Sequence, residues 1–309
     1  MPIQTTCNGA AEIAYETFGE PGGTPLLLVM GLNFQMVWWP DGFCRALATR
    51  GFHVARYDNR DSGLTTHFPT PRRNPLVALF KRSRRQPPYT GDDLAADGIA
   101  VLDALDWPAA HVAGVSMGSA LAAMMAAQYP DRVLTLTSLS GGGRGTIGDI
   151  LRYVRWGALL RLIRRVPRGQ GRQAEQLAFI AAEMYRPGYP ADERWLQETA
   201  AIAIERDPDP AAANQRQLTA LRAGSKLRPL LARITAPALI VHGADDPLIK
   251  PLSSRMLARE LPGSRLVIIP RMGHSLPEPL WPTVVDEFAR HAGLTAQFPP
   301  PIEPVRPTA

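Results

Sequence analysis

The stretch HVAGVSMGSALAAMMAAQYP, residues 111–130, decides the fold because it joins a strand pattern to a helix pattern through a short turn. Its first part is a short apolar run typical of a buried strand, and its last part is a longer apolar run that favours a helix. Between them, Gly114-Val115-Ser116-Met117-Gly118 sets a serine between two glycines. A turn that needed only flexibility could use glycine alone, so the hydroxyl of Ser116 needs an explanation.

A sharp strand-to-helix turn accounts for both glycines. The residue at the apex of such a turn has a strained backbone and close neighbours, so small residues are needed two positions before and after it. Gly114 and Gly118 meet this need. The Ser116 oxygen would then stand clear of the sheet edge at the positive end of a helix, which suits a nucleophile. The alternative is a glycine-flanked helix N-cap, in which Ser116 only accepts a backbone N–H.

The alternation of strand and helix continues on both sides of this turn. Most of the strand patterns are continuously apolar, as strands covered on both faces are. The pattern predicts an α/β fold with a mostly parallel central sheet and helices on both faces. Further strand patterns begin at Glu12, Leu26, His53, Val133, Ala238 and Arg265, and helix patterns cover 41–50, 92–105, 117–129, 251–261 and 281–292.

The alternation stops between residues 144 and 226, where helix patterns alternate with polar connections. We expect an inserted helical cap over 144–226, and an α/β core formed by 1–143 and 227–293. The last residues, 294–309, are rich in proline and predict an extended tail.

A serine hydroxyl needs a base to accept its proton, and His274 is the best placed of the six histidines. It follows the final strand pattern, in a loop shaped by Gly273 and Pro277. The alternative is that His274 is a solvated loop residue. His242 ends a strand and could line the site without the freedom of a loop. We interpret the others as structural or surface residues, namely His53, His67, His111 and His291.

A histidine that acts as a base needs a carboxylate to fix its tautomer. The stretch VHGADDPLIKP, residues 241–251, supplies adjacent aspartates at the carboxyl end of the preceding strand, where open α/β sheets bind their ligands. We choose Asp246, with Asp245 as the runner-up. The alternative role for the chosen aspartate is to cap the turn before Pro247.

In the order Ser116, Asp246, His274, the chain resembles the α/β-hydrolases over nearly its whole length outside the cap and tail. The resemblance implies a serine hydrolase, and the sequence predicts neither a metal site nor a cofactor. It also implies an oxyanion hole formed by the backbone N–H groups of Met117 and Leu32. The usual His-Gly of the second loop is Met30-Gly31 here, which leaves the anchoring of that loop open.

Three further segments are similar to a subgroup of bacterial esterases that includes the aclacinomycin-type polyketide methylesterases. They are VMGLN…WWPDGF, RYDNRDSGLTT and YTGDDLAADGIAVLDAL. Asp58, Arg60 and Gly63 fit the turn that this family has after its fourth strand. Asp61 replaces the more usual glycine, and the sequence offers no physical account of it.

These features predict a carboxylic ester hydrolase that acts on small to medium apolar esters through an acyl-enzyme. Phe34, Trp38 and Trp39 are expected to line an apolar pocket, or else to pack in the core. A serine nucleophile excludes the haloalkane dehalogenases and epoxide hydrolases of this fold, which use aspartate. The alternatives are a polyketide methylesterase, an amide, thioester or carbon–carbon bond hydrolase, and a ligand receptor on a hydrolase scaffold.

The net charge of +6 comes mostly from two arginine-rich stretches, and no nucleic-acid-binding motif accompanies them. In the first, at 152–172, Tyr153, Trp156, Leu160 and Ile163 share one helix face. The prediction favoured is that this face covers the active site, and the alternative is contact with anionic lipid. The second, at 72–85, predicts a solvated loop that can attract acidic substrates.

The composition, 45% hydrophobic and 20% charged, is ordinary for a soluble globular protein. Cys7 and Cys44 are too few for a disulfide framework and lie in no zinc motif. The start of the chain lacks the pattern of a secretory signal, and no apolar run reaches the roughly 18 residues of a membrane span. The default expectation is cytoplasmic residence, with a homodimer allowed by the sequence.

Overall fold

An eight-stranded sheet forms the centre of the computed structural model, which describes residues 2–69, 87–142, 147–167, 169, 171–207 and 210–294. The spatial order of the strands is β1-β2-β4-β3-β5-β6-β7-β8. The strands are β1 (Gln4–Asn8), β2 (Ala11–Phe18), β3 (Thr24–Val29), β4 (Phe52–Tyr57), β5 (Ala110–Val115), β6 (Val133–Leu139), β7 (Ala238–Gly243) and β8 (Arg265–Ile269).

Strands β3 to β8 pair in parallel, whereas β1 and β2 form an antiparallel edge. The predicted mostly parallel sheet is confirmed. Strand β1 is an addition that the sequence patterns do not predict, because its residues QTTCN are polar and largely exposed. Its backbone is ordered by pairing with β2, from Gln4 opposite Tyr15 to Asn8 opposite Ala11.

Helices cover both faces of the sheet, as predicted. Helices α1 and α12 contact each other on one face, and α3, α4 and α10 pack together on the other. Helix α4 is apolar on all sides and lies buried beneath its neighbours. These helices are α1 (Asp41–Ala48), α3 (Gly91–Ala104), α4 (Met117–Gln128), α10 (Leu227–Leu231), α11 (Leu252–Glu260) and α12 (Trp281–His291). Short 3₁₀ turns are η1 (Met36–Trp38), η2 (Pro130–Arg132) and η3 (Glu278–Leu280).

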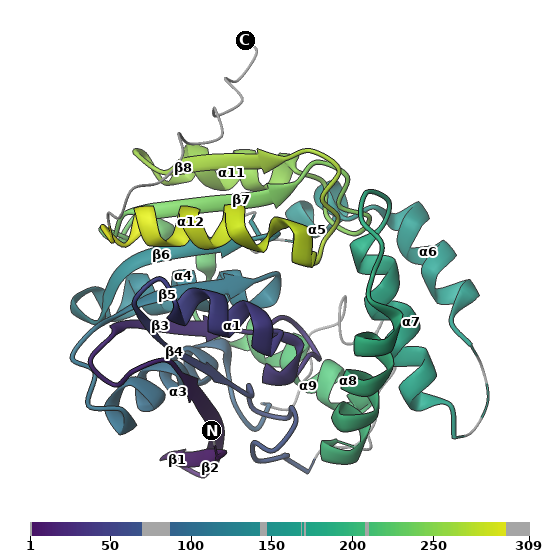
Figure 1. Ribbon diagram of the computed structural model, residues 1–309, viewed down its shortest axis with the longest axis horizontal. Coiled ribbons are helices and arrows are strands. Elements are labelled where there is room, and N and C mark those ends of the chain that lie inside the picture. Colours follow the sequence, from purple (N-terminus) through teal and green to yellow (C-terminus); the bar gives the residue numbers. More distant parts are fainter. Residues whose placement is uncertain are drawn as a thin grey trace.

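A helical segment lies between β6 and β7, and we call its members the β6–β7 helices. They are α5 (Ile147–Tyr153), α6 (Trp156–Arg165), α7 (Gln173–Tyr185), α8 (Glu193–Arg206) and α9 (Pro210–Ala223). In Figure 1, α6, α7 and α8 stand to the right of the sheet, on the side to which the arrowheads of β7 and β8 point. The basic stretch 72–85 and the tail from 295 lie outside the described residues. Within the described part of the chain, no helix has both the length and the apolar character to cross a membrane.

The apolar residues that α6 buries differ from those that the sequence predicts for its inward face. Tyr153, just before it, is buried, but Leu160 and Ile163 are 51% and 52% exposed. The partly buried side of α6 contains Ala158 and Leu162 instead. The expectation that one continuous apolar face covers the site is therefore wrong for Leu160 and Ile163, because the inward side of the helix is rotated away from them.

Candidate active site

Ser116 occupies the predicted turn between β5 and α4. Its backbone has φ 55° and ψ −115°, outside the regions that serine ordinarily adopts. A Cβ on Gly114 would lie 2.0 Å from the Gly118 oxygen, and one on Gly118 would lie 2.1 Å from the Val29 oxygen. Only glycine fits at either position. The Ser116 side chain makes no capping hydrogen bond, so the N-cap alternative lacks its defining contact.

His274 and Asp246 meet in a hydrogen bond between the loops after β8 and β7. His274 Nδ1 lies 2.6 Å from Asp246 Oδ2, and Asp246 is fully buried. Because an ionised carboxylate can only accept, Nδ1–H is the donor, and in a neutral imidazole this tautomer has its lone pair on Nε2. Asp245, the runner-up, is exposed. The structure thus brings together the aspartate and histidine that the sequence favours.

Asp246 is held in its ionised form by a dense set of donors. Its Oδ1 accepts from the N–H groups of Leu248 at 2.7 Å and Ile249 at 2.8 Å. Its Oδ2 also lies 3.2 Å from Nε2 of His242. Burial alone would raise the pKa of Asp246, but the electrostatic interaction with His274 and the hydrogen bonds from both histidines outweigh this effect. The pKa of Asp246 is therefore well below its usual value.

The order of the strands determines where Ser116 lies relative to Asp246 and His274. It follows β5, whereas Asp246 follows β7 and His274 follows β8. The carboxyl ends of parallel strands meet at one edge, so all three side chains belong to the same edge of the sheet. Among the described residues, no hydrogen bond joins Ser116 to His274.

The loop that carries Leu32 passes directly beside Ser116. A Cβ on Gly31 would lie 3.3 Å from Cβ of Ser116 and 4.0 Å from its Oγ. The other expected oxyanion donor, Met117, is the first residue of α4. Both backbone groups are thus adjacent to the serine in space or in sequence.

Polar side chains from the turn after β4 anchor this loop in the absence of the usual histidine. Asn59 Nδ2 donates to the Met30 carbonyl at 3.0 Å, and the Met36 N–H donates to Asp58 Oδ1 at 2.6 Å. The second oxygen of Asp58 accepts from the Leu64 N–H at 2.9 Å. Burial raises the pKa of Asp58 to about 6, although these two N–H groups act in the opposite direction. The anchoring that the sequence leaves open is provided by Asn59 and Asp58.

Asp61 joins the same turn to helix α9. It is fully buried and has φ 65°, a conformation that explains why glycine is usual at this position. Its Oδ1 lies 2.8 Å from Nε of Arg216, and it also accepts from the Phe68 N–H at 2.8 Å and from the Tyr89 hydroxyl. The ion pair with Arg216 is the physical account of Asp61 that the sequence lacks.

The three aromatic residues expected to line a pocket separate into two groups. Phe34 meets Trp38 edge-on with ring centroids 5.0 Å apart, and Trp38 meets Trp195 of α8 edge-on at 5.7 Å. Trp39 stacks on Phe43 of α1 at 5.9 Å and is buried, which is core packing. Neither cavity described below is lined by Phe34, Trp38 or Trp39.

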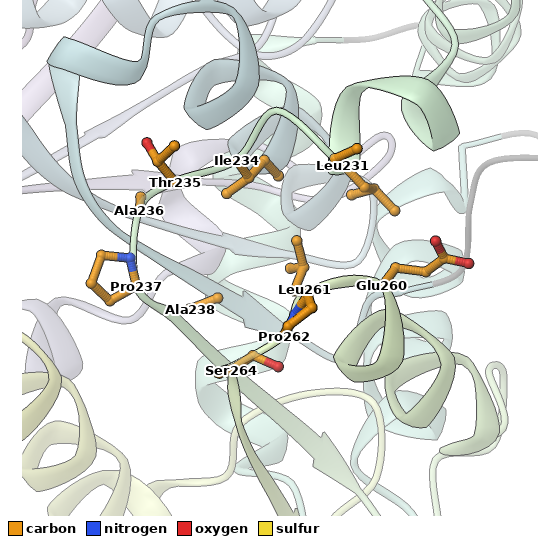
Figure 2. Close-up of a pocket in the computed structure, with 12 residues that line it drawn as sticks. Leu231, Ile234, Thr235, Ala236, Pro237, Ala238, Glu260, Leu261, Pro262 and Ser264 are labelled. Atoms are coloured by element: carbon orange, nitrogen blue, oxygen red, sulfur yellow. The ribbon is translucent and has the colours of Figure 1, made fainter.

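Two small cavities lie at opposite ends of the sheet. A cavity of about 150 Å³ is bounded by residues 231–238 and 260–264, at the amino ends of β7 and β8 (Figure 2). This end is remote from Asp246, which follows the carboxyl end of β7. A second cavity, of about 140 Å³, lies between α6, α7 and the Pro247–Leu248 segment directly after Asp246. Only the second cavity adjoins the candidate site.

Comparison with known proteins places this fold and site in a family. A family model described as the alpha/beta hydrolase fold matches residues 24–278. The chain belongs to this family. Rhodomycin D methylesterase DauP from Streptomyces sp. (strain C5) is similar to this α/β-hydrolase, with 32% identity over 299 residues that cover 90% of this chain and 93% of its own. Rhodomycin D methylesterase DnrP from Streptomyces peucetius is 32% identical over 300 residues, with coverage of 90% and 93%.

Solved structures resemble this α/β-hydrolase in fold. The esterase RhEst1 from Rhodococcus sp. ECU1013 has a TM-score of 0.73 at 17% identity, and the match covers 95% of this chain and 99% of that one. The expected resemblance to α/β-hydrolase esterases is confirmed, and the relatives support activity as a hydrolase.

His242 lines the site from the buried side, as the sequence analysis allows: its Nε2 lies 3.2 Å from Asp246 Oδ2, and Ser254 Oγ lies 2.7 Å from its Nδ1. Two other polar residues near the site have no signal in the sequence. Arg216 and Gln217 reach the site region from α9. A buried polar side chain is recognised by its partners, and these partners are more than 100 residues away in the chain for Arg216 and Gln217. A local pattern cannot reveal them.

Proposed function

We propose that this α/β-hydrolase is a carboxylic ester hydrolase in which Ser116 is the nucleophile, His274 the base and Asp246 the residue that orients the histidine. The observation that carries the proposal is the backbone of Ser116, with φ 55° at the start of α4. Such a conformation costs about 1–3 kcal/mol and is concentrated at functional sites. The His274–Asp246 hydrogen bond at the same edge of the sheet supplies the base that the serine needs.

In the proposed reaction, the Ser116 oxygen attacks the ester carbonyl while His274 Nε2 takes the serine proton. The N–H groups of Leu32 and Met117 stabilise the oxyanion, and each such donor is worth a factor of roughly 10² to 10³ in turnover. His274 then protonates the departing alkoxide, which leaves as the alcohol. Water attacks the acyl-serine with the same histidine as base, and the carboxylic acid is released.

Hydrolysis of p-nitrophenyl acetate and butyrate tests this mechanism. Ser116→Ala should lower kcat by about 10⁴-fold or more, to the background rate. Ser119→Ala is the matched control, because Ser119 lies on the same helix and its hydroxyl bonds to Ser138. It should keep most of the activity. Equal rates for wild type and Ser116→Ala would refute the serine mechanism, and an inactive wild type would favour a ligand receptor or a narrow specialist.

A methyl ester of an aromatic polyketide is the second candidate substrate. The two rhodomycin D methylesterases, similar to 90% of this chain, favour it. We also propose that the β6–β7 helices, within residues 144–226, form a cap that selects the substrate. This proposal is supported by the backbone N–H of His274, which donates to the backbone carbonyl of Met184 in α7 at 2.7 Å. Esters of graded acyl length should be compared with a polyketide methyl ester. Preference for short acyl chains supports a general carboxylesterase, and activity confined to the methyl ester supports the second candidate.

A further inference from the structure

We propose that Gln217 on α9 is a positioning residue for the loop that carries the Leu32 N–H group. The inference rests on the proposed function, because it connects a β6–β7 helix to the oxyanion hole. Gln217 is fully buried, although it lies on a helix outside the central sheet. A buried amide is costly unless it is hydrogen-bonded, so its partners indicate what it does.

Both ends of the Gln217 amide are bonded, and they point to different loops. Its Oε1 accepts from the Asn33 N–H at 3.0 Å. Its Nε2 donates to the Arg60 carbonyl at 2.8 Å and to Ser62 Oγ at 2.9 Å. Gln217 therefore ties the loop after β3 to the turn after β4. A side chain without both a donor and an acceptor cannot make this connection.

The Leu32 N–H lies between two fixed peptide planes. The Met30 carbonyl, in the peptide before Gly31, accepts from Asn59. The Asn33 N–H, in the peptide after Leu32, donates to Gln217. Because each peptide unit is rigid and planar, fixing the planes on both sides limits how the intervening Leu32 N–H can turn. The hydrogen bond from the Phe34 N–H to the Gly31 carbonyl within this loop is long, at 3.3 Å, so it is a weak substitute for the bond to Gln217.

Helix α9 is a firm support for this side chain. The neighbouring Arg216 forms its ion pair with the buried Asp61, and Ala220 packs in the cluster beneath α3 and α4. An oxyanion donor is effective only when it is held in place before the reaction. Gln217 would therefore affect the rate of the chemical step more than the binding of substrate.

Kinetics of Gln217→Met test this role, since methionine has a similar shape and cannot form the bonds. With p-nitrophenyl butyrate, kcat should fall about tenfold, less than removal of a donor, while KM changes by less than about twofold. The matched control is Gln128→Met at the far end of α4, where Gln128 bonds to Asp92. It should keep the wild-type kcat. An unchanged kcat in Gln217→Met, or an equal fall in both variants, overturns the proposal.

Amide hydrogen exchange gives a second measurement that does not depend on esterase activity. Exchange over residues 30–36 should be faster in Gln217→Met than in wild type, and unchanged in Gln128→Met. Wild-type exchange over 30–36 in Gln217→Met refutes the positioning role. Ser116→Ala with wild-type activity refutes the proposed function separately.

Discussion

Helices α6 and α9 both lie between β6 and β7, yet they meet the rest of the protein in opposite ways. Helix α9 inserts a buried ion pair and a fully buried glutamine into the turn after β4. Helix α6 leaves Leu160 and Ile163 about half exposed, and Arg165 lies 3.6 Å from Glu183 of the neighbouring helix α7. Helix α9 is therefore bonded to the core through buried polar groups, although it belongs to the proposed cap.

The largest expected effect is on stability when Arg216 is removed. In Arg216→Met, the buried carboxylate of Asp61 loses its cation, and breaking a buried pair costs about 3–5 kcal/mol. Urea denaturation measures the loss. Arg161→Met on α6, where the arginine is exposed, is the control and should change stability by less than about 0.5 kcal/mol. Similar losses in both variants would remove the distinction between the helices.

Removing both charges should be less harmful than removing one. The double variant Asp61→Gly/Arg216→Met has no unpaired buried charge at this site, and glycine suits the φ of 65°. We expect it to be about 1–3 kcal/mol more stable than Arg216→Met alone. If the double variant is no more stable, the Asp61–Arg216 contact is not the reason that α9 adheres to the core.

Amide hydrogen exchange of the wild-type protein should distinguish α9 from α6 by their exchange rates. Amides in α9 are expected to exchange about tenfold or more slowly than those in α6, because opening α9 must also break its buried polar bonds. Exchange followed by peptide mass spectrometry gives both rates in one sample. Equal protection would mean that the β6–β7 helices open as one unit.

The smallest effect is expected on the exposed side of α6. Leu160→Ser with Ile163→Ser should change the free energy of unfolding by less than about 0.5 kcal/mol, since both side chains are already half exposed. Leu177→Ser on α7 is the comparison, because Leu177 is 7% exposed and its loss should cost at least about 2 kcal/mol. A large loss in the α6 variant would mean that these residues are covered in solution.

The sequence is most informative where local chemistry dictates the structure. The turn at Ser116 could be predicted because only glycine fits at Gly114 and Gly118. The pairing of Asp246 with His274 could be predicted because strand order brings successive loops to one edge of a parallel sheet.

The sequence is uninformative where a residue depends on a distant partner. Asp61 is unexplained until Arg216 is seen beside it, and Gln217 resembles any polar helix residue until its burial is known. The sequence does not predict strand β1 for a related reason. This exposed, polar edge strand is ordered by its pairing with β2, and it has no apolar pattern of its own.

The link between α9 and the turn after β4 has a practical consequence for chimeras. Transplanting the whole β6–β7 segment from a relative would change the helices expected to select substrate, but it would also remove the arginine and the glutamine that the recipient scaffold requires. A graft that ends before α9 keeps these contacts native. A longer graft has to bring the donor's own residues for positions 61 and 62 with it.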